Sequence, residues 1–261
     1  MQDISSKFRF FKLRKKIWRS KPYRLYLKIY DIFLKGVLKL NKKQTTIIFI
    51  NGMRRSGNHY LMKTLMDSSS ASVIFYNNQN YYSSLDIRKG LQTKFRFTYK
   101  ILLLIGYEDL SINDFYKTCD YFKQGYLKEL KTLKLIVVRD LRNIMASRLN
   151  HAHLAKLLRK DRKVLEHTRL LWRNHHEDYG DSKSNIIRYS NLVKDLNQLD
   201  LSLFFIPNLK ESKKVLNRYG GGSSFNNKHF NSRYLEFEND KTFLELIDGL
   251  KKHDEFVHGK W

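Results

Sequence analysis

The sequence predicts an α/β fold, a three-layer sandwich in which helices cover both faces of a central parallel sheet. Short apolar or β-branched segments alternate with helical patterns along most of the chain, as in proteins with a parallel sheet. One segment, residues 101–105, is apolar at every position, which is typical of a strand buried on both faces. With 261 residues, the chain is long enough for one substantial domain. We expect this domain at 44–261, after a basic amphipathic segment at 1–43.

The predicted elements follow from this alternation. The strands are expected at 47–50, 73–76, 101–105, 135–138 and 185–189. Helices are expected after the loop from Asn51 to Asn58, from Ser111 as N-cap to about Lys131, after Arg139, from Asn150 to Tyr179, from Ser190, and from Phe243 to Leu250. Residues 81–98 are polar, basic and aromatic without clear periodicity, so no element is assigned to them.

The N-terminal segment carries fourteen Lys or Arg residues against Asp3 and Asp31. Its apolar residues recur at three- and four-residue steps, as on one face of a helix: Tyr26, Ile29, Tyr30, Phe33, Val37 and Leu40. Such a helix can make a peripheral contact with an anionic membrane surface. Alternatively, the apolar face packs on the domain and the lysines are solvated. Both interpretations stay open.

The composition favours an anionic partner, because the net charge is +25. The single Cys119 excludes a disulfide framework within the chain and a cysteine zinc cluster, and favours a reducing compartment. The sequence has no apolar run of membrane-spanning length, and its N-terminus does not resemble a secretory signal. We therefore expect a cytoplasmic protein, peripheral to the membrane if residues 1–43 bind lipid.

The first anion-binding motif follows the strand at 47–50. Gly52 and Gly57 have the glycine spacing of the phosphate loop, GxxxxGK[ST], where backbone N–H groups and a helix N-terminus surround an anion. Asn58 and His59 replace the Lys and the Ser or Thr of that loop, which argues against a Mg-nucleotide site. Arg54 and Arg55 instead place guanidinium groups, which can bind phosphate or sulfate with paired donors, before the turn.

The second motif follows the strand at 135–138. Arg139 ends this strand, and Ser147 lies eight residues further on, within the next helix. Asn143 and Ser147 are four residues apart and share one helical face. We expect the guanidinium and the hydroxyl to hold one anionic group between them.

Both motifs resemble those of the PAPS-dependent sulfotransferases, and the resemblance covers roughly residues 45–230. The loop matches their 5′-phosphosulfate-binding loop at Arg55, Ser56, Gly57, Asn58 and His59. Arg139 and Ser147 match the segment that binds the 3′-phosphate, and Tyr189 matches a tyrosine near the adenine. Ser190 and Asn191 depart from the acidic pair that follows this tyrosine in the family.

The resemblance implies a P-loop NTPase-like sulfotransferase fold, PAPS as sulfuryl donor, PAP as product, and no metal. It implies an acceptor with a hydroxyl or amine, such as a glycan, glycoconjugate or small hydroxyl compound. Arg55 would stabilise charge on the transferring group. Glu108, after the third strand, is the first candidate for the general base, and His59 is the second. Arg218 and Gly220 match a mobile loop that closes over the 3′-phosphate in the family, or belong to a flexible linker.

Two alternatives to a sulfotransferase remain. The first is a P-loop-type nucleotide kinase or hydrolase, against which the missing Lys and Ser or Thr argue. The second is a non-enzymatic basic protein that binds nucleic acid or membrane. Of these two partners, nucleic acid is not the expected one. The histidines do not have the spacing of a metal site, so no metal is expected.

Overall fold

The computed structural model describes residues 41–53, 57–76, 92–94, 96–123, 128–176, 185–209 and 233–250, and the helical positions 22, 25, 29, 32, 36, 39 and 40. The chain divides into two compact units, Met1–Lys43 and Gln44–Trp261. Among the described residues, no helix has both the length and the apolar character needed to cross a bilayer. The second unit contains the sheet and the helices that cover it.

The centre of this unit is a six-stranded sheet with the order β3-β2-β4-β1-β5-β6. Its strands are β1 (Thr45–Gly52), β2 (Ser72–Tyr76), β3 (Gln92–Lys94), β4 (Ile101–Glu108), β5 (Lys131–Val138) and β6 (Asn185–Arg188). Five strands run parallel, and β3 pairs with β2 antiparallel at the edge. The central strand β1 is buried along its whole length, because it pairs with β4 and β5 and helices cover its faces.

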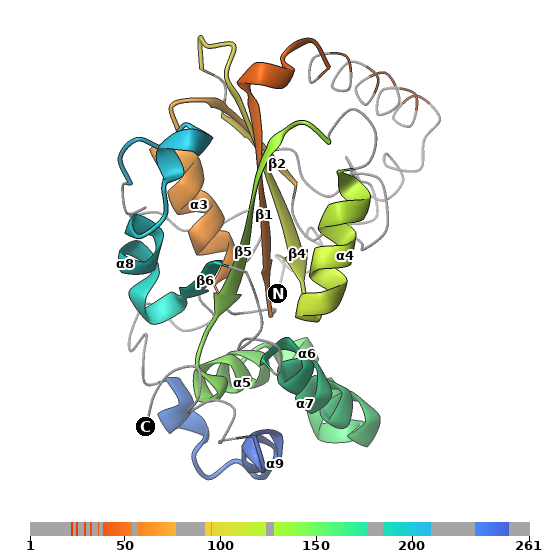
Figure 1. Cartoon of the computed structure of the whole chain (residues 1–261). Helices are drawn as coiled ribbons and strands as arrows, with labels where there is room; N and C mark the ends of the chain where they lie inside the picture. Colours follow the sequence, from red (N-terminus) through yellow and green to blue (C-terminus); the bar gives the residue numbers. More distant parts are fainter. Residues whose placement is uncertain are drawn as a thin grey trace, which may run out of the picture. The chain divides into compact units, whose positions relative to one another are not determined.

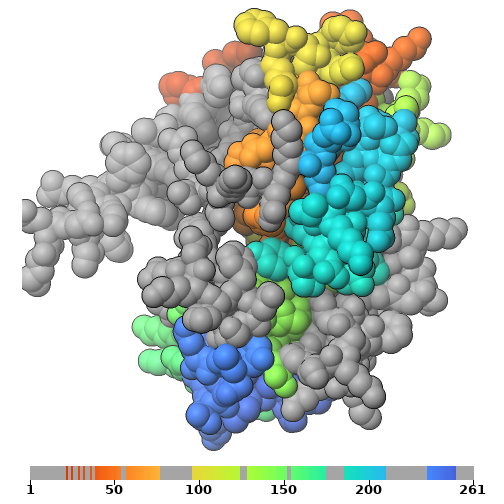
Figure 2. Space-filling view, turned by 90° about the vertical axis from the view of Figure 1, so that its left-hand side faces the viewer, coloured from red at the N-terminus to blue at the C-terminus, as the bar shows by residue number. Residues whose placement is uncertain are grey.

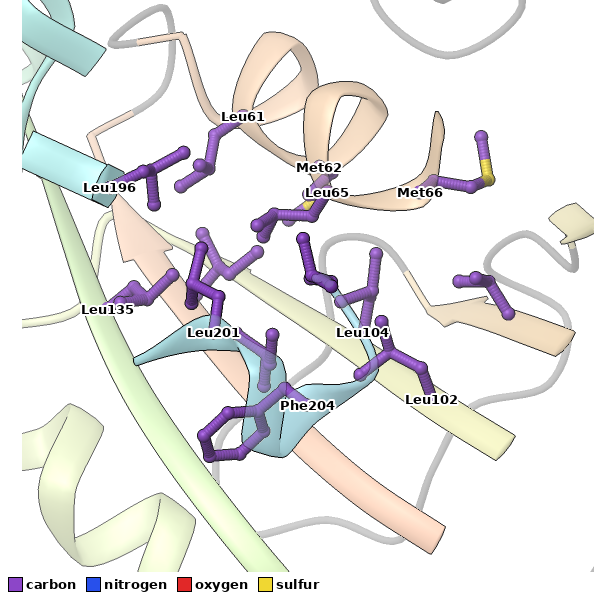
Figure 3. Close-up of a cluster of buried hydrophobic side chains, with 14 of the residues drawn as sticks. Leu61, Met62, Leu65, Met66, Leu102, Leu104, Leu135, Leu196, Leu201 and Phe204 are labelled. Atoms are coloured by element: carbon purple, nitrogen blue, oxygen red, sulfur yellow. The ribbon is translucent and has the colours of Figure 1, made fainter. Parts of the chain in front are cut away.

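One face of the sheet is covered by α3 (Asn58–Ser68), α8 (Leu192–Asn197) and the 3₁₀ helix η5 (Leu201–Phe204). Figure 2 shows the orange residues of α3 beside the cyan residues of α8. Leucine and methionine side chains of α3 meet side chains of β4, β5, α8 and η5 in a continuous apolar layer (Figure 3). Burial of this apolar face drives the docking of α3 on the sheet.

The opposite face is covered by α4 (Ile112–Phe122), as Figure 1 shows. Phe122 contacts Phe49 of β1 edge to face, with ring centroids 5.5 Å apart. Phe115 contacts Tyr107 of β4 in the same way, at 6.0 Å. Cys119 is buried here, and this burial raises the pKa of its thiol, so the sulfur is a core atom.

A further group of helices lies beyond the carboxyl end of β5 (Figure 1). It comprises α5 (Leu141–Leu149), α6 (Ala152–Lys160), α7 (Arg162–His176), η6 (Arg233–Phe237) and α9 (Lys241–Ile247). These helices share a second apolar core, in which Trp172 is fully buried. This core supports α5, and α5 follows the strand that ends beside Arg139.

The predicted α/β fold with a central parallel sheet flanked by helices is confirmed. All five predicted strands occur, but Tyr189 belongs to the 3₁₀ helix η4 (Tyr189–Asn191) rather than to β6. The predicted end of the helix at about Lys131 is wrong, because α4 ends at Phe122 and Lys131 is the first residue of β5. The expected helical stretch after Asn150 is two helices that meet at Asp161.

Candidate functional site

The candidate site lies at the carboxyl ends of β1 and β5. After β1 the chain continues through α3 to β2, which lies towards one edge of the sheet. After β5 it continues through α5 and on to β6, which lies at the other edge. Two neighbouring parallel strands whose connections diverge in this way form a topological switch point, where open α/β sheets bind ligands. Gly57, Arg139 and Tyr189 lie in the connections after β1, β5 and β6, respectively.

Gly57 and Tyr189 are in direct contact. Gly57 is the N-cap of α3 and has a φ of 107°, a conformation that side chains other than hydrogen rarely allow. A Cβ at this position would lie 2.2 Å from Cδ2 and 2.3 Å from Cε2 of Tyr189. The ring of Tyr60, in the first turn of α3, meets the Tyr189 ring edge to face at 6.1 Å. Glycine is therefore required here for two reasons, its dihedral angle and the aromatic ring against its Cα.

Arg139 lies on the same tyrosine. Its guanidinium carbon is 4.6 Å from the centroid of the Tyr189 ring, a cation–π contact. The side chain is buried, and this burial lowers the pKa of the guanidinium, although the neighbouring Asp140 opposes the shift. Arginine remains protonated even so. A buried cation at a switch point favours an anionic ligand, which would offset the cost of removing the charge from water.

The turn that carries Tyr189 is held by an ion pair. Arg188, the last residue of β6, donates from Nε and Nη2 to the two oxygens of Asp195 in α8, at 3.0 and 2.8 Å. The backbone N–H of Arg188 also donates to Asp195, at 2.8 Å. These hydrogen bonds raise the pKa of Arg188. The three bonds fix the residue before Tyr189 and so restrict where its ring can lie.

The side chain of Asn58 is used inside the protein. Its Nδ2 donates to the backbone oxygen of Gly52, at 3.1 Å, and to that of Tyr107, at 3.3 Å. The N–H of Asp109 donates to the same Gly52 oxygen, at 3.2 Å. Asn58 thus joins the start of the loop and the start of α3 to the end of β4. A ligand at this position would therefore contact the backbone of the helix N-terminus rather than the side chain of Asn58.

The two candidate bases lie on either side of the loop. Glu108 is the last residue of β4 and pairs in register with Gly52, and His59 is the second residue of α3; both are half-buried. The residue after Glu108, Asp109, has a φ of 60° and accepts a 2.8 Å hydrogen bond from Nη2 of Arg148 in α5. This largely buried ion pair holds the chain just beyond Glu108.

The start of α5 is capped by its own side chain. Oδ1 of Asp140 accepts from the N–H and from Nδ2 of Asn143, both at 2.8 Å. The side-chain amide of Asn143 is therefore engaged with Asp140. Ser147 lies one turn further along α5 and is only 3% exposed. Arg139 is buried to the same extent, at 4% exposed, so burial does not rank the two side chains as ligand contacts.

Several predicted site residues lie outside the described residues: Arg54, Arg55, Ser56, Arg218 and Gly220. Within the described ranges, no three His, Cys, Asp or Glu side chains are grouped so that they could hold a metal ion. The described part of the site therefore comprises one glycine-led helix start, one buried arginine and one aromatic ring that contacts both.

Sequence reasoning did not find three structural contributors to this site. The Asp109–Arg148 pair joins residues that no motif spacing connects. Asn51 is a polar residue at the end of an apolar strand, and this position was a usable signal: its Nδ2 donates to the oxygen of Leu110, at 2.9 Å. Tyr60 is the third, because its contact with Tyr189 depends on the packing of α3.

Comparisons of the chain with protein-family models, curated protein sequences and solved structures give no significant match.

Proposed function

We propose that this protein is a PAPS-dependent sulfotransferase that transfers the sulfuryl group to a hydroxyl or amine of an acceptor, such as a glycan. The observation that carries the proposal is the contact of Tyr189 with both Gly57 and Arg139 at the switch point. The two resembling motifs are far apart in the sequence, and this ring connects them. The loop after β1, with Arg55, is the proposed site for the 5′-phosphosulfate, and Arg139 with Ser147 is the proposed site for the 3′-phosphate.

The residues present fit an anionic adenine nucleotide. Arg139 supplies a desolvated cation, and α3 begins at a residue without a side chain, so backbone N–H groups can approach an anion closely. Tyr189 is half-buried, and we propose that its ring lies near the adenine base. The side chain of Asn58 bonds the protein backbone rather than occupying the position of a phosphate-loop lysine, which supports a donor other than a Mg-nucleotide.

The proposed reaction moves one sulfuryl group. The acceptor oxygen or nitrogen attacks sulfur, the bond between sulfur and the phosphate oxygen breaks, and the acceptor proton goes to a base. Glu108 and His59 are both proposed for this base. Glu108 pairs with Gly52 at the start of the loop, and His59 follows the end of the loop. Arg55 is proposed to stabilise negative charge on the leaving phosphate.

Calorimetric titration with adenosine 3′,5′-bisphosphate, in metal-free buffer, tests the donor site. We expect saturable binding that Arg139→Ala and Arg55→Ala each weaken by about 10- to 100-fold, the usual value of a charge-assisted hydrogen bond. Arg162→Ala is the matched control, because this arginine is on α7 with its side chain 64% exposed. Its affinity should equal that of the wild type.

A second titration separates the alternatives. ATP with Mg²⁺ should bind much more weakly than the bisphosphate. Equal or tighter binding of Mg-ATP would favour a nucleotide kinase or hydrolase, and equal losses in the Arg139 and Arg162 variants would show only general attraction to a basic protein.

A further inference from the structure

The unit Met1–Lys43 presents large aliphatic side chains to solvent. Leu25 and Ile29 are each 58% exposed, Ile32 is 71% exposed and Leu40 is 86% exposed. All four positions are helical, and their spacing of four, three and eight residues places them on one face of the helix. At 1.5 Å per residue, this apolar face is about 22 Å long.

The sequence of this segment also predicts a basic stripe. Helical spacing would place four cations next to the apolar positions: Arg24, Lys28, Lys35 and Lys39. Lys39 is described and is exposed. Asp31 is the one acidic residue between positions 22 and 43 of the sequence. The exposed apolar face is thus observed at four described positions, and the sequence predicts a cationic border beside it.

We propose that the face formed by Leu25, Ile29, Ile32 and Leu40 docks on an anionic lipid bilayer, with the helix lying in the plane of the interface. Aliphatic side chains of such a helix enter the headgroup region, and the lysines beside them reach lipid phosphates and carboxylates. The helix lies along the surface rather than across the membrane, because a crossing orientation would place its cations in hydrocarbon.

The chemistry of this face favours lipid over nucleic acid. Single-stranded nucleic acid is bound by aromatic rings interleaved with cations, because bases stack on rings. The four exposed side chains at the described positions are aliphatic, although the stripe in the sequence also carries Tyr26, Tyr30 and Phe33. A bilayer instead supplies an apolar layer directly below a negative surface, which matches the two adjoining stripes. This proposal does not rest on the proposed donor site.

Vesicle co-sedimentation of the full-length protein tests the proposal. The vesicles are phosphatidylcholine alone, and an equal mixture of phosphatidylcholine and phosphatidylserine. We expect strong binding to the anionic vesicles only, decreasing with salt. Lys35→Gln/Lys39→Gln should lower this affinity about 25-fold, since each surface lysine is worth about fivefold. Ile29→Ser/Ile32→Ser should lower it about tenfold or more, because the aliphatic side chains no longer enter the interface.

Matched controls use exposed residues of the second unit. Lys156→Gln/Lys160→Gln, on α6, makes the same charge change, and Leu203→Ser/Leu244→Ser removes aliphatic side chains that are 48% and 49% exposed. Both control variants should bind anionic vesicles like the wild type. Equal losses in the lysine controls would overturn the proposal, because net charge alone would then explain the binding.

Three other outcomes would also overturn it. Equal binding to neutral vesicles would remove the role of the basic stripe. A lower melting temperature in the Ile29/Ile32 variant, with unchanged vesicle binding, would mean that this face packs on the protein itself. Dimerisation without lipid that this variant abolishes, measured by analytical ultracentrifugation, would make a second copy of the chain the occupant.

Discussion

The two strand-to-helix junctions at the switch point, β1–α3 and β5–α5, begin their helices in different ways. Asp140 caps α5 with its own carboxylate, as Ser111 caps α4 with its hydroxyl. Gly57 begins α3 and has no side chain to do so. The β5–α5 junction instead places a buried guanidinium, Arg139, directly before its cap. Under the proposed function, the two junctions would attract an anion in complementary ways: a helix start without a side chain at its N-cap on one strand, and a desolvated cation on its neighbour.

Gly57→Ala should disrupt the β1–α3 junction and have the largest effect on stability. The positive φ and the overlap with the Tyr189 ring should together lower the free energy of unfolding by about 3 kcal/mol. Gly249→Ala is the matched control, because its φ is 68° but the nearest atom to a new Cβ, Nη2 of Arg169, is 3.8 Å away. We expect about 1 kcal/mol there. Urea unfolding measures both.

The ring contribution can be isolated with a double-mutant cycle. Adding Tyr189→Ala to Gly57→Ala should recover the part of the loss that comes from the overlap. If both glycine variants cost the same and the cycle shows no coupling, the tyrosine ring moves away without cost, and the contact does not hold the junction.

Asn58→Ala should weaken the same junction by about 2 kcal/mol, because two backbone oxygens at the ends of β1 and β4 lose a donor. The comparable residue at the other junction is Asn143, whose side-chain amide adds a second hydrogen bond to Oδ1 of Asp140, which already accepts the N–H of Asn143. Asn143→Ala should cost about 1 kcal/mol. The opposite order in denaturant unfolding would contradict the proposed difference between the junctions.

Asp140→Ala should remove the cap of α5 and cost about 1 kcal/mol. Asp140→Asn should recover most of this loss, since an amide oxygen also accepts the Asn143 N–H. Oδ2 of Asp140 lies 4.0 Å from Nε of Arg139, so its charge is a competing explanation. Thermal unfolding distinguishes them: equal losses in both variants would assign the effect to charge rather than to capping.

Asp240, the cap of α9, gives the smallest effect and a pH dependence. Burial tends to raise the pKa of this carboxyl, but hydrogen bonds from Arg159 and from the N–H of Phe243 outweigh it and lower the pKa below 3.8. Because the pKa of Asp240 is lower in the folded than in the unfolded state, its ionised carboxylate stabilises the folded protein above the unfolded-state pKa. This stabilisation is lost as the pH falls through the lowered, folded-state pKa. Asp240→Asn should cost about 0.5 kcal/mol at neutral pH, because the ion pair is partly exposed.

The melting temperatures of the wild type and the Asp240→Asn variant should therefore converge as the pH falls below 3.8. A difference that stays constant across this range would mean that the charge of Asp240 contributes nothing beyond the cap.

The sheet was predictable because its strands carry local signals. The segment Ile101–Glu108, for example, begins with an apolar run that is typical of a strand buried on both faces. The start of β5 was not predictable, because Lys131 and Lys134 resemble the polar end of a helix. These residues become strand by pairing with Thr46 and Phe49 of β1, a non-local interaction that no spacing reveals. The edge strand β3 is three residues long and was missed for the same reason.

The positions of the site residues were predictable in part. Strand ends placed Arg139 and Tyr189 at the same edge of the sheet, and the structure brings them into contact. Side-chain direction was not predictable: Asn58 lies in the predicted loop, yet its amide points to the backbone of Gly52 and Tyr107. The Asp109–Arg148 pair depends on how α5 packs beside the end of β4, which is a tertiary property.

The ring of Tyr189 against the Cα of Gly57 has a spectroscopic consequence. Protons held close to an aromatic ring experience its ring current, so the two Gly57 Hα resonances should be displaced from ordinary glycine positions. A molecule that enters the loop and turns this ring would shift those resonances at once. Gly57 is therefore a built-in nuclear magnetic resonance reporter of what happens between β1 and β6, readable without any attached label.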